Sequence, residues 1–209
     1  MTMKKIMLSQ LLAGLVVGSA CLTAVAQTAD PQVQAVLKSS FRAEGIAKLD
    51  RIEQDENQAL CSDAKFRDSP AGQAKLVALQ NASLAKIKPP SDGKYLGDWK
   101  EGEKIAQSGR GATWSDSATA ANGGSCYNCH QLDKKEISFG NIGPSLTGYG
   151  KTRGTGQEIL VYTWNRVNNS KAYNACSNMP RFAHFDLLTE QQIKDVMALL
   201  LDPKSPVNE

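Results

Sequence analysis

Histidine is scarce in this chain of 209 residues, which contains only His130 and His184. Residues 27–90 contain no histidine at all. Because a histidine-ligated haem needs that side chain beside its iron, this absence excludes a haem of that kind from residues 27–90.

Strong charge of one sign and long apolar runs are missing as well. The chain has 24 lysine and arginine residues against 21 aspartate and glutamate residues, a formal net charge of +3. It has no basic run and no aromatic residues interleaved with basic ones, so nucleic acid is not an expected partner. Beyond the first residues no stretch is long and apolar enough to span a bilayer, and we therefore expect no membrane span.

The beginning of the chain has the pattern of a secretory signal peptide. Two lysines precede a short apolar stretch at residues 8–17, and a small-x-small site, Ala-Val-Ala, ends at Ala26. We therefore predict that residues 1–26 are a signal peptide, that cleavage follows Ala26 and that the mature protein is periplasmic. Cys21 does not complete a lipidation signal, because Gly18 stands where a lipobox carries leucine.

The stretch with the clearest chemistry is Cys126-Tyr127-Asn128-Cys129-His130. Two cysteines separated by two residues and followed directly by histidine form the attachment sequence of a c-type haem. On a turn of helix the two thiols face the same side, where they can form thioethers with both vinyl groups of one porphyrin. The adjacent His130 then lies against the iron as an axial ligand. The motif therefore predicts one covalently attached haem c.

The alternative interpretation of this motif is half of a zinc site. Such a site needs two further Cys or His ligands at suitable spacing. Only His184 and Cys176 remain for this purpose in the C-terminal half, and they are not paired in the sequence.

Two cysteines, Cys61 and Cys176, belong to neither the signal peptide nor the haem motif. Isolated cysteine pairs in an oxidising compartment commonly form disulfides. We hypothesise a Cys61–Cys176 disulfide.

The second axial position of the iron has three candidate ligands in the mature chain. Met197 falls on the apolar stripe of a predicted helix and is expected in the core. Met179 lies in a loop just before that helix, where Pro180 stiffens the backbone. We favour Met179 over His184, with an open site as the third alternative. A methionine sulfur raises the reduction potential relative to a second imidazole.

Hydrophobic periodicity predicts helices along most of the chain. Asp30-Pro31 is a favourable helix start, and Ser69-Pro70 begins the pattern again before residues 88–90 end it. Residues 27–95 therefore read as a helical extension, a hairpin of about two helices, which precedes a domain at 96–209.

Three helices are predicted in the second part. Asp98 can cap a helix over residues 99–109 whose small residues would let another helix approach closely. A further helix is expected from residue 159 to about 169. Thr189 and Gln192 form a capping box at the start of the last helix, which carries a single apolar stripe.

Taken in order, the haem motif, Gly143-Pro144, Met179-Pro180 and a C-terminal amphipathic helix resemble the class I cytochrome c family, an all-α fold. The resemblance implies that the carbonyl of Pro144 accepts a hydrogen bond from the axial histidine, His130. From the residues alone, Gly143-Pro144 can supply this acceptor or be merely a turn. The resemblance also implies that Met179 is the distal ligand.

Longer stretches of residues 95–209 resemble SoxX, the family of small monohaem cytochromes in the thiosulfate-oxidising Sox system. They are residues 140–146 (Gly-Asn-Ile-Gly-Pro-Ser-Leu), 149–154 (Tyr-Gly-Lys-Thr-Arg-Gly), 176–182 (Cys-Ser-Asn-Met-Pro-Arg-Phe), 188–190 (Leu-Thr-Glu) and 198–203 (Ala-Leu-Leu-Leu-Asp-Pro), with 205–208 (Ser-Pro-Val-Asn) following. The extension at 27–95 is not part of a minimal class I cytochrome.

The resemblance implies a heterodimer with the SoxA cytochrome. That complex, an L-cysteine S-thiosulfotransferase, oxidatively joins thiosulfate to a cysteine of the SoxYZ carrier, and the bond-forming haem belongs to SoxA. This chain would be the electron-accepting subunit, passing electrons to a soluble cytochrome c, and would not catalyse the reaction alone. Two alternatives remain open: a free-standing periplasmic electron shuttle and a haem-based ligand sensor.

Overall fold

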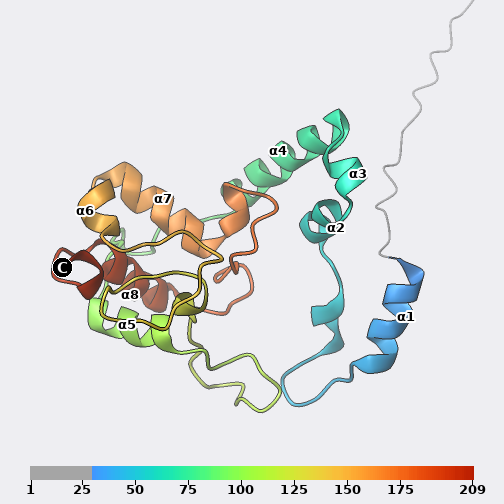
Figure 1. The fold of residues 1–209 in the computed structure, drawn as a ribbon, viewed down its shortest axis with the longest axis horizontal. Helices are drawn as coiled ribbons and strands as arrows, with labels where there is room; N and C mark the ends of the chain where they lie inside the picture. Colours follow the sequence, from blue (N-terminus) through green and yellow to red (C-terminus); the bar gives the residue numbers. More distant parts are fainter. Residues whose placement is uncertain (1–29) are drawn as a thin grey trace, which may run out of the picture.

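The computed structural model describes residues 30–209, and apart from one isolated bridge all regular elements within that range are helical (Figure 1). The predicted signal peptide, residues 1–26, lies outside this range. The all-α prediction is confirmed. The helices are α1 (Pro31–Ser40), α2 (Glu56–Ser62), α3 (Ala64–Arg67), α4 (Pro70–Ala85), α5 (Trp99–Gln107), α6 (Tyr149–Arg153), α7 (Gln157–Asn168) and α8 (Glu190–Leu201), with 3₁₀ turns η1 (Leu49–Ile52), η2 (Cys126–Asn128), η3 (Ser170–Ala172) and η4 (Pro206–Asn208).

Helices α5 and α8 pack closely together at the centre of the C-terminal part (Figure 1). The Asp98 side chain accepts a hydrogen bond of 2.8 Å from the backbone N–H of Lys100, so the predicted cap of α5 is present. A Cβ on Gly102 would lie only 2.1 Å from the carbonyl oxygen of Asp195 on α8. Only glycine therefore allows the two backbones to approach this closely, as the small residues in α5 predicted.

Helix α8 provides most of the buried core. Thr189 and Gln192 form the predicted capping box. Met197 is fully buried, which agrees with its predicted place in the core. Besides Met197, α8 contributes Ile193, Val196, Leu199, Leu200 and Leu201 to the buried core. The other buried core residues come from α5, α7 and the connecting segments: Ala106, Tyr127, Leu132, Trp164, Val167, Phe182, Leu188 and Val207.

The N-terminal extension consists of several short helices, where the sequence suggested a hairpin of about two. The periodicity that runs through residues 42–54 does not form an α-helix. Gly45 adopts a left-handed conformation with φ of 51°, and a Cβ there would lie 2.0 Å from the carbonyl oxygen of Trp114. This close approach of two backbones interrupts the helix and leaves only the short turn η1. Helix α4 does begin at Ser69-Pro70 as expected, with the Ser69 hydroxyl capping the Gly72 N–H.

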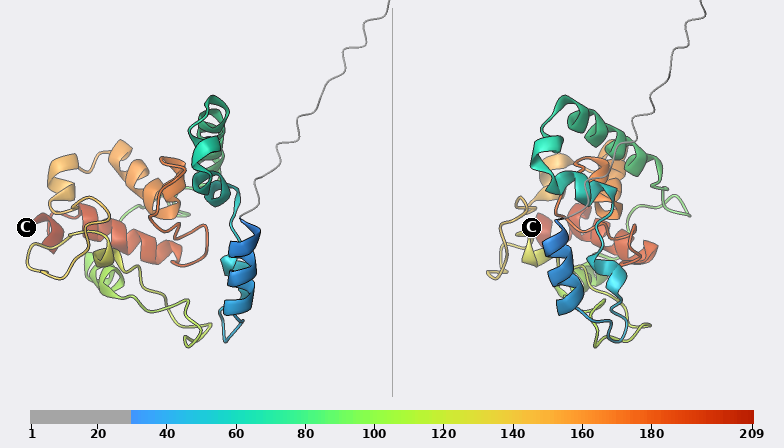
Figure 2. Two further views of the ribbon diagram at one scale, coloured as in Figure 1. Left: turned by 45° about the vertical axis from the view of Figure 1, so that its right-hand side comes forward. Right: turned by 90° about the vertical axis from the view of Figure 1, so that its right-hand side faces the viewer.

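The extension lies along one end of the C-terminal part and contacts it at several points (Figure 2). Helix α4 packs against η3, and the indole N–H of Trp164 donates a 2.8 Å hydrogen bond to the carbonyl of Lys88. A disulfide joins Cys61 of α2 to Cys176, the pairing that the sequence analysis hypothesised. Within residues 30–209, no helix combines the length and apolar character needed to cross a membrane.

Candidate haem site

The two motif cysteines lie on the 3₁₀ turn η2 and directly after it. Ser125 enters the turn in a left-handed conformation, with φ of 50°. The backbone N–H of His130 then donates a 2.9 Å hydrogen bond to the carbonyl of Cys126, which places cysteine and histidine on one turn. Both thiols are half-buried and neither is in a disulfide. Burial raises the pKa of the Cys126 thiol to about 12, so this side chain stays a neutral thiol at physiological pH.

The ring of His130 is held from two sides. Its Nδ1 lies 2.7 Å from the carbonyl oxygen of Pro144. Because a carbonyl only accepts, Nδ1 carries the proton, and Nε2 is left with a lone pair for a metal. A Cβ on Gly143 would lie 2.2 Å from Cε1, 2.5 Å from Nδ1 and 2.7 Å from Nε2 of the same ring. The imidazole therefore rests directly on the Gly143 backbone, in the orientation that an axial ligand requires.

Tyr127, between the two cysteines, ties the motif to helix α5. Its buried hydroxyl donates to the carboxylate of Glu103, with oxygen–oxygen distances of 3.0 and 3.2 Å, and it accepts from the Asp133 N–H at 3.3 Å. Burial raises the pKa of the phenol, and the negative charge of Glu103 raises it further. Tyr127 thus anchors the haem motif to α5 through Glu103. Sequence spacing does not reveal that Glu103 has this role.

Met179 lies in the loop between η3 and α8, half-buried and packed against the hydrophobic core. The Ser170 hydroxyl donates a 2.6 Å hydrogen bond to its carbonyl, and its N–H donates to the Ser177 hydroxyl at 3.2 Å. His184, the alternative ligand, is exposed on the same loop, and its ring packs edge-on against Phe185 with centroids 4.8 Å apart. Burial and the nearby Arg181 charge lower the pKa of His184.

A zinc site at the motif would need two more Cys or His ligands. Across residues 30–209, no three or more His, Cys, Asp or Glu side chains are grouped where they could hold a metal ion. Cys176, one of the two residues considered for such a site, is bonded to Cys61.

Comparison with known proteins gives the family. Residues 115–203, which include the haem motif and Met179, match the family described as cytochrome c. The chain is also similar to a protein of Aquifex aeolicus (strain VF5) named "Uncharacterized lipoprotein", with 37% identity over 158 residues, 75% of this chain and 73% of the relative. The chain therefore contains a cytochrome c domain. Because that alignment is longer than the segment 96–209, the similarity continues into the part of this cytochrome before residue 96.

A cytochrome c domain implies covalently bound haem c and supports electron transfer. The residues of this cytochrome fit that group: two unpaired thiols share one turn with a histidine whose free Nε2 is set by a backbone carbonyl. The space above Gly143, filled by the imidazole, is the clearest sign of this fit, since any side chain at that position would displace the ring.

Apart from the Cys61–Cys176 disulfide, sequence reasoning missed the contacts between the extension and the loop that carries Met179. The guanidinium of Arg181 pairs with the carboxylate of Asp55, which lies 126 residues earlier in the chain. The Arg181 side chain is 95% buried and also lies over the ring of Phe185, 4.4 Å from its centroid. No local pattern links two residues so far apart. The only signal in the sequence was the isolated pair Cys61 and Cys176, because a disulfide between them brings the segment around Asp55 close to the segment around Arg181.

Proposed function

We propose that this cytochrome is a SoxX-type electron relay, the monohaem subunit of a SoxAX complex. In this proposal SoxA and this chain together form an L-cysteine S-thiosulfotransferase that joins thiosulfate to a cysteine of SoxYZ. Electrons released in that step pass through this chain to a soluble cytochrome c. The observation that carries the proposal is the fixed orientation of His130 between Gly143 and the Pro144 carbonyl, which suits a haem that exchanges electrons without changing its ligands.

One haem c, when bound, supplies an iron that gains and loses a single electron. The chain's own residues hold it in place. Cys126 and Cys129 provide the thioether sulfurs, and His130 provides the proximal nitrogen. Met179 provides the distal sulfur, because it is packed against the core whereas His184 faces solvent. If His130 and Met179 both held the iron, no position would be left for substrate, and the chemistry that the haem would supply is outer-sphere electron transfer.

The remainder of the chain supports a relay better than an enzyme that acts alone. No activated nucleophile or acid–base pair accompanies the haem motif in the sequence. The assignment to the Sox system rests on the sequence stretches at 140–154 and 176–208 that resemble SoxX. Bond formation with sulfur is therefore assigned to SoxA.

We propose that the protein is exported, with the signal peptide removed after Ala26. The relative from Aquifex aeolicus is named a lipoprotein, and a lipoprotein is an exported protein, so its name agrees with export. The periplasm is also the compartment in which a Cys61–Cys176 disulfide persists.

Complex formation tests this function against a free-standing electron shuttle. When the chain is produced together with SoxA in a host that attaches haem c, we expect a stable 1:1 complex that survives size-exclusion chromatography. Recovery of the chain as a lone monomer would favour the shuttle. Prompt binding of CO or cyanide by the native protein would instead favour a haem-based sensor, which needs a labile distal ligand.

A further inference from the structure

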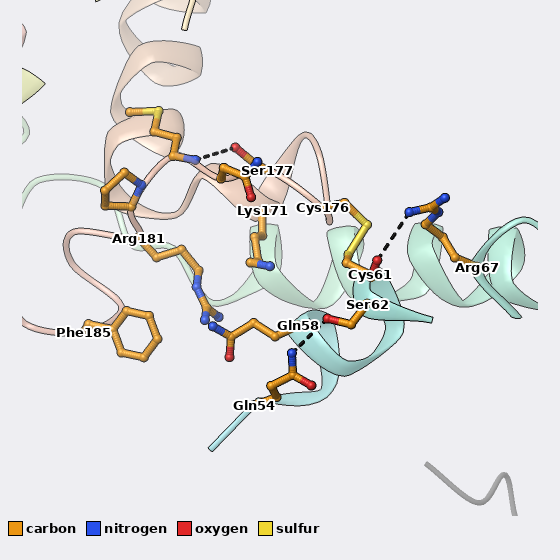
Figure 3. A pocket seen from close by; sticks show the side chains of 13 residues that line it. Gln54, Gln58, Cys61, Ser62, Arg67, Lys171, Cys176, Ser177, Arg181 and Phe185 are labelled. Carbon is orange, nitrogen blue, oxygen red and sulfur yellow. Dashed lines mark hydrogen bonds between the residues drawn. A yellow bond between two sulfur atoms is a disulfide. The ribbon is translucent and has the colours of Figure 1, made fainter. Parts of the chain in front are cut away.

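The loop that carries Met179 is attached to the N-terminal extension on both sides of the methionine. We define the Met179 loop as residues 173–188. Cys176, three residues before Met179, is joined to Cys61 of α2 by the disulfide. Arg181, two residues after Met179, is paired with Asp55, the N-cap residue of α2. One short helix and its N-cap therefore hold the loop at two points that bracket the methionine. Figure 3 shows the first of these points, the disulfide between Cys61 and Cys176.

Each member of the Asp55–Arg181 ion pair makes a further contact that fixes its position. Asp55 is the N-cap of α2, and its other carboxylate oxygen accepts a 2.9 Å hydrogen bond from the Gln58 N–H. Burial raises the pKa of Asp55, but the Gln58 N–H and the Arg181 guanidinium outweigh it, so the net pKa is lowered and the group is ionised. Arg181 is 95% buried and packs over Phe185. Loss of the carboxylate charge would leave a buried guanidinium without its partner.

Apart from the disulfide and the ion pair, α2 and the Met179 loop are not packed continuously against each other. A cavity of about 560 Å³ lies between α2 and the Met179 loop, lined largely by polar side chains that include Gln54, Gln58 and Lys171 (Figure 3). Where apolar packing between two segments is interrupted in this way, the few strong contacts that cross the gap determine how often the segments separate.

The C-terminal part of the loop is anchored in its own domain, because Phe182 and Leu188 belong to the buried core. Around Met179 the attachment to the domain is weaker. The side chain is only partly buried against the core, its carbonyl accepts a hydrogen bond from the Ser170 hydroxyl, and its N–H donates to Ser177 within the loop itself. A segment attached by a few contacts of this kind opens locally at a small fraction of the global unfolding free energy. A crosslink that ties such a loop to a distant segment restricts its open states.

We propose that the extension is a clamp on the distal ligand, with Asp55 and Cys61 as positioning residues that keep Met179 against the iron. The inference rests on the proposed role of Met179 as the distal ligand. It gives the extension, which a minimal class I cytochrome lacks, a task at the haem site. Loss of either attachment lets the Met179 loop open more often without removing any haem ligand.

Imidazole binding to the oxidised holoprotein measures this opening, because imidazole reaches the iron only when the distal ligand has left. The principal variant is Asp55→Asn, which keeps an N-cap oxygen for α2 but removes the charge that Arg181 needs. We expect imidazole to bind about tenfold faster than in the wild type when observed by stopped-flow absorbance. Asp55→Glu, which retains the carboxylate, should restore a rate near that of the wild type.

Glu56→Gln is the matched control. Glu56 is the neighbouring carboxylate, and its salt bridge of 2.6 Å runs to Lys75 within the extension, away from the Met179 loop. This variant should bind imidazole at the wild-type rate. A second test removes the disulfide with Cys61→Ser and Cys176→Ser together, and we expect an acceleration at least as large as that of Asp55→Asn. Hydrogen exchange should show faster opening in residues 173–188 for both kinds of variant.

The outcomes separate this inference from the proposed ligation. If the wild type lacks the near-infrared band of a methionine–iron bond, Met179 is not the ligand and the proposed function loses its basis. If the band is present but Asp55→Asn and the double cysteine variant bind imidazole at the wild-type rate, the clamp is wrong while the ligation stands. If Glu56→Gln accelerates binding as much as Asp55→Asn, the effect is general loosening of α2, and the clamp is again wrong.

Discussion

We expect the replacement of Met179 with alanine to abolish a near-infrared absorption band of the oxidised protein and to lower its reduction potential. The band arises from charge transfer between a methionine sulfur and the iron, so it cannot outlast that bond. A methionine ligand raises the potential, and we expect its loss to cost on the order of 0.1 V of the roughly 0.8 V range that axial ligands control. Absorbance spectroscopy and a potentiometric titration provide both measurements.

Met197→Leu is the control for this prediction. Met197 is the other methionine of the described chain, fully buried on α8, and a leucine of similar volume should leave both band and potential unchanged. Survival of the band in Met179→Ala would remove Met179 from the iron. A band that disappears in Met197→Leu but persists in Met179→Ala would transfer the ligand to the core methionine and contradict the fold described here.

Gly143→Ala should disrupt the proximal side of the haem. The new Cβ would lie 2.2 Å from Cε1 of His130, far inside van der Waals contact, so the imidazole or the backbone must move by about 1 Å or more. Either movement strains the 2.7 Å contact between Nδ1 and the Pro144 carbonyl. We expect a loss of about 1–3 kcal/mol in unfolding free energy and a high-spin component in the absorption spectrum. Thermal unfolding of the holoprotein and its visible spectrum measure these effects.

Gly156→Ala provides the comparison for Gly143→Ala. Gly156 precedes α7, and a Cβ there would meet no atom within 4 Å. We expect its visible spectrum to match that of the wild type. Because Gly156 is the N-cap of α7 and alanine is a poorer N-cap than glycine, the unfolding free energy should fall by less than about 1 kcal/mol. A normal low-spin spectrum and unchanged stability in Gly143→Ala would show that the His130 ring is not seated on this glycine.

Much of the cytochrome domain could be predicted because its signals are local. The Asp98 cap, the capping box of Thr189 and Gln192, and the stripe of α8 each depend on residues within a few positions of one another, and each is present in the structure. Gly102 is also a local signal, because a residue without a side chain on a helix predicts that another helix can approach closely, as α8 approaches α5. Local backbone chemistry determines these features before any long-range contact forms.

The parts that escaped prediction depend on residues far apart in the chain. The helix expected through residues 42–54 is absent because Gly45 meets the carbonyl of Trp114, a contact that no periodicity reports. The pairing of Asp55 with Arg181 spans 126 residues, and the contact of Glu103 with Tyr127 spans 24. Charged residues in such positions read as solvated surface until the fold brings their partners together.

The residues of the candidate site fall between these two cases. The spacing of Cys126, Cys129 and His130 predicts the haem. The structure places the Pro144 carbonyl beside Nδ1 of His130, the contact that the family resemblance implied. For Met179 the structure adds a distinction that the sequence lacked: the methionine packs against the core, whereas His184 lies exposed beside Phe185. Of the two attachments of this loop to the extension, the Cys61–Cys176 disulfide was hypothesised from the sequence, whereas the Asp55–Arg181 pair emerged only from the fold.

Thiosulfate-dependent reduction of a soluble cytochrome c, reconstituted with SoxA and SoxYZ, tests the central claim most directly. We expect that turnover requires this chain, proceeds fully with Met197→Leu and falls by about tenfold or more with Met179→Ala. Reduction at the full rate when this chain is omitted would contradict the account, because the electrons would then reach the acceptor without passing through Cys126–His130 and its haem.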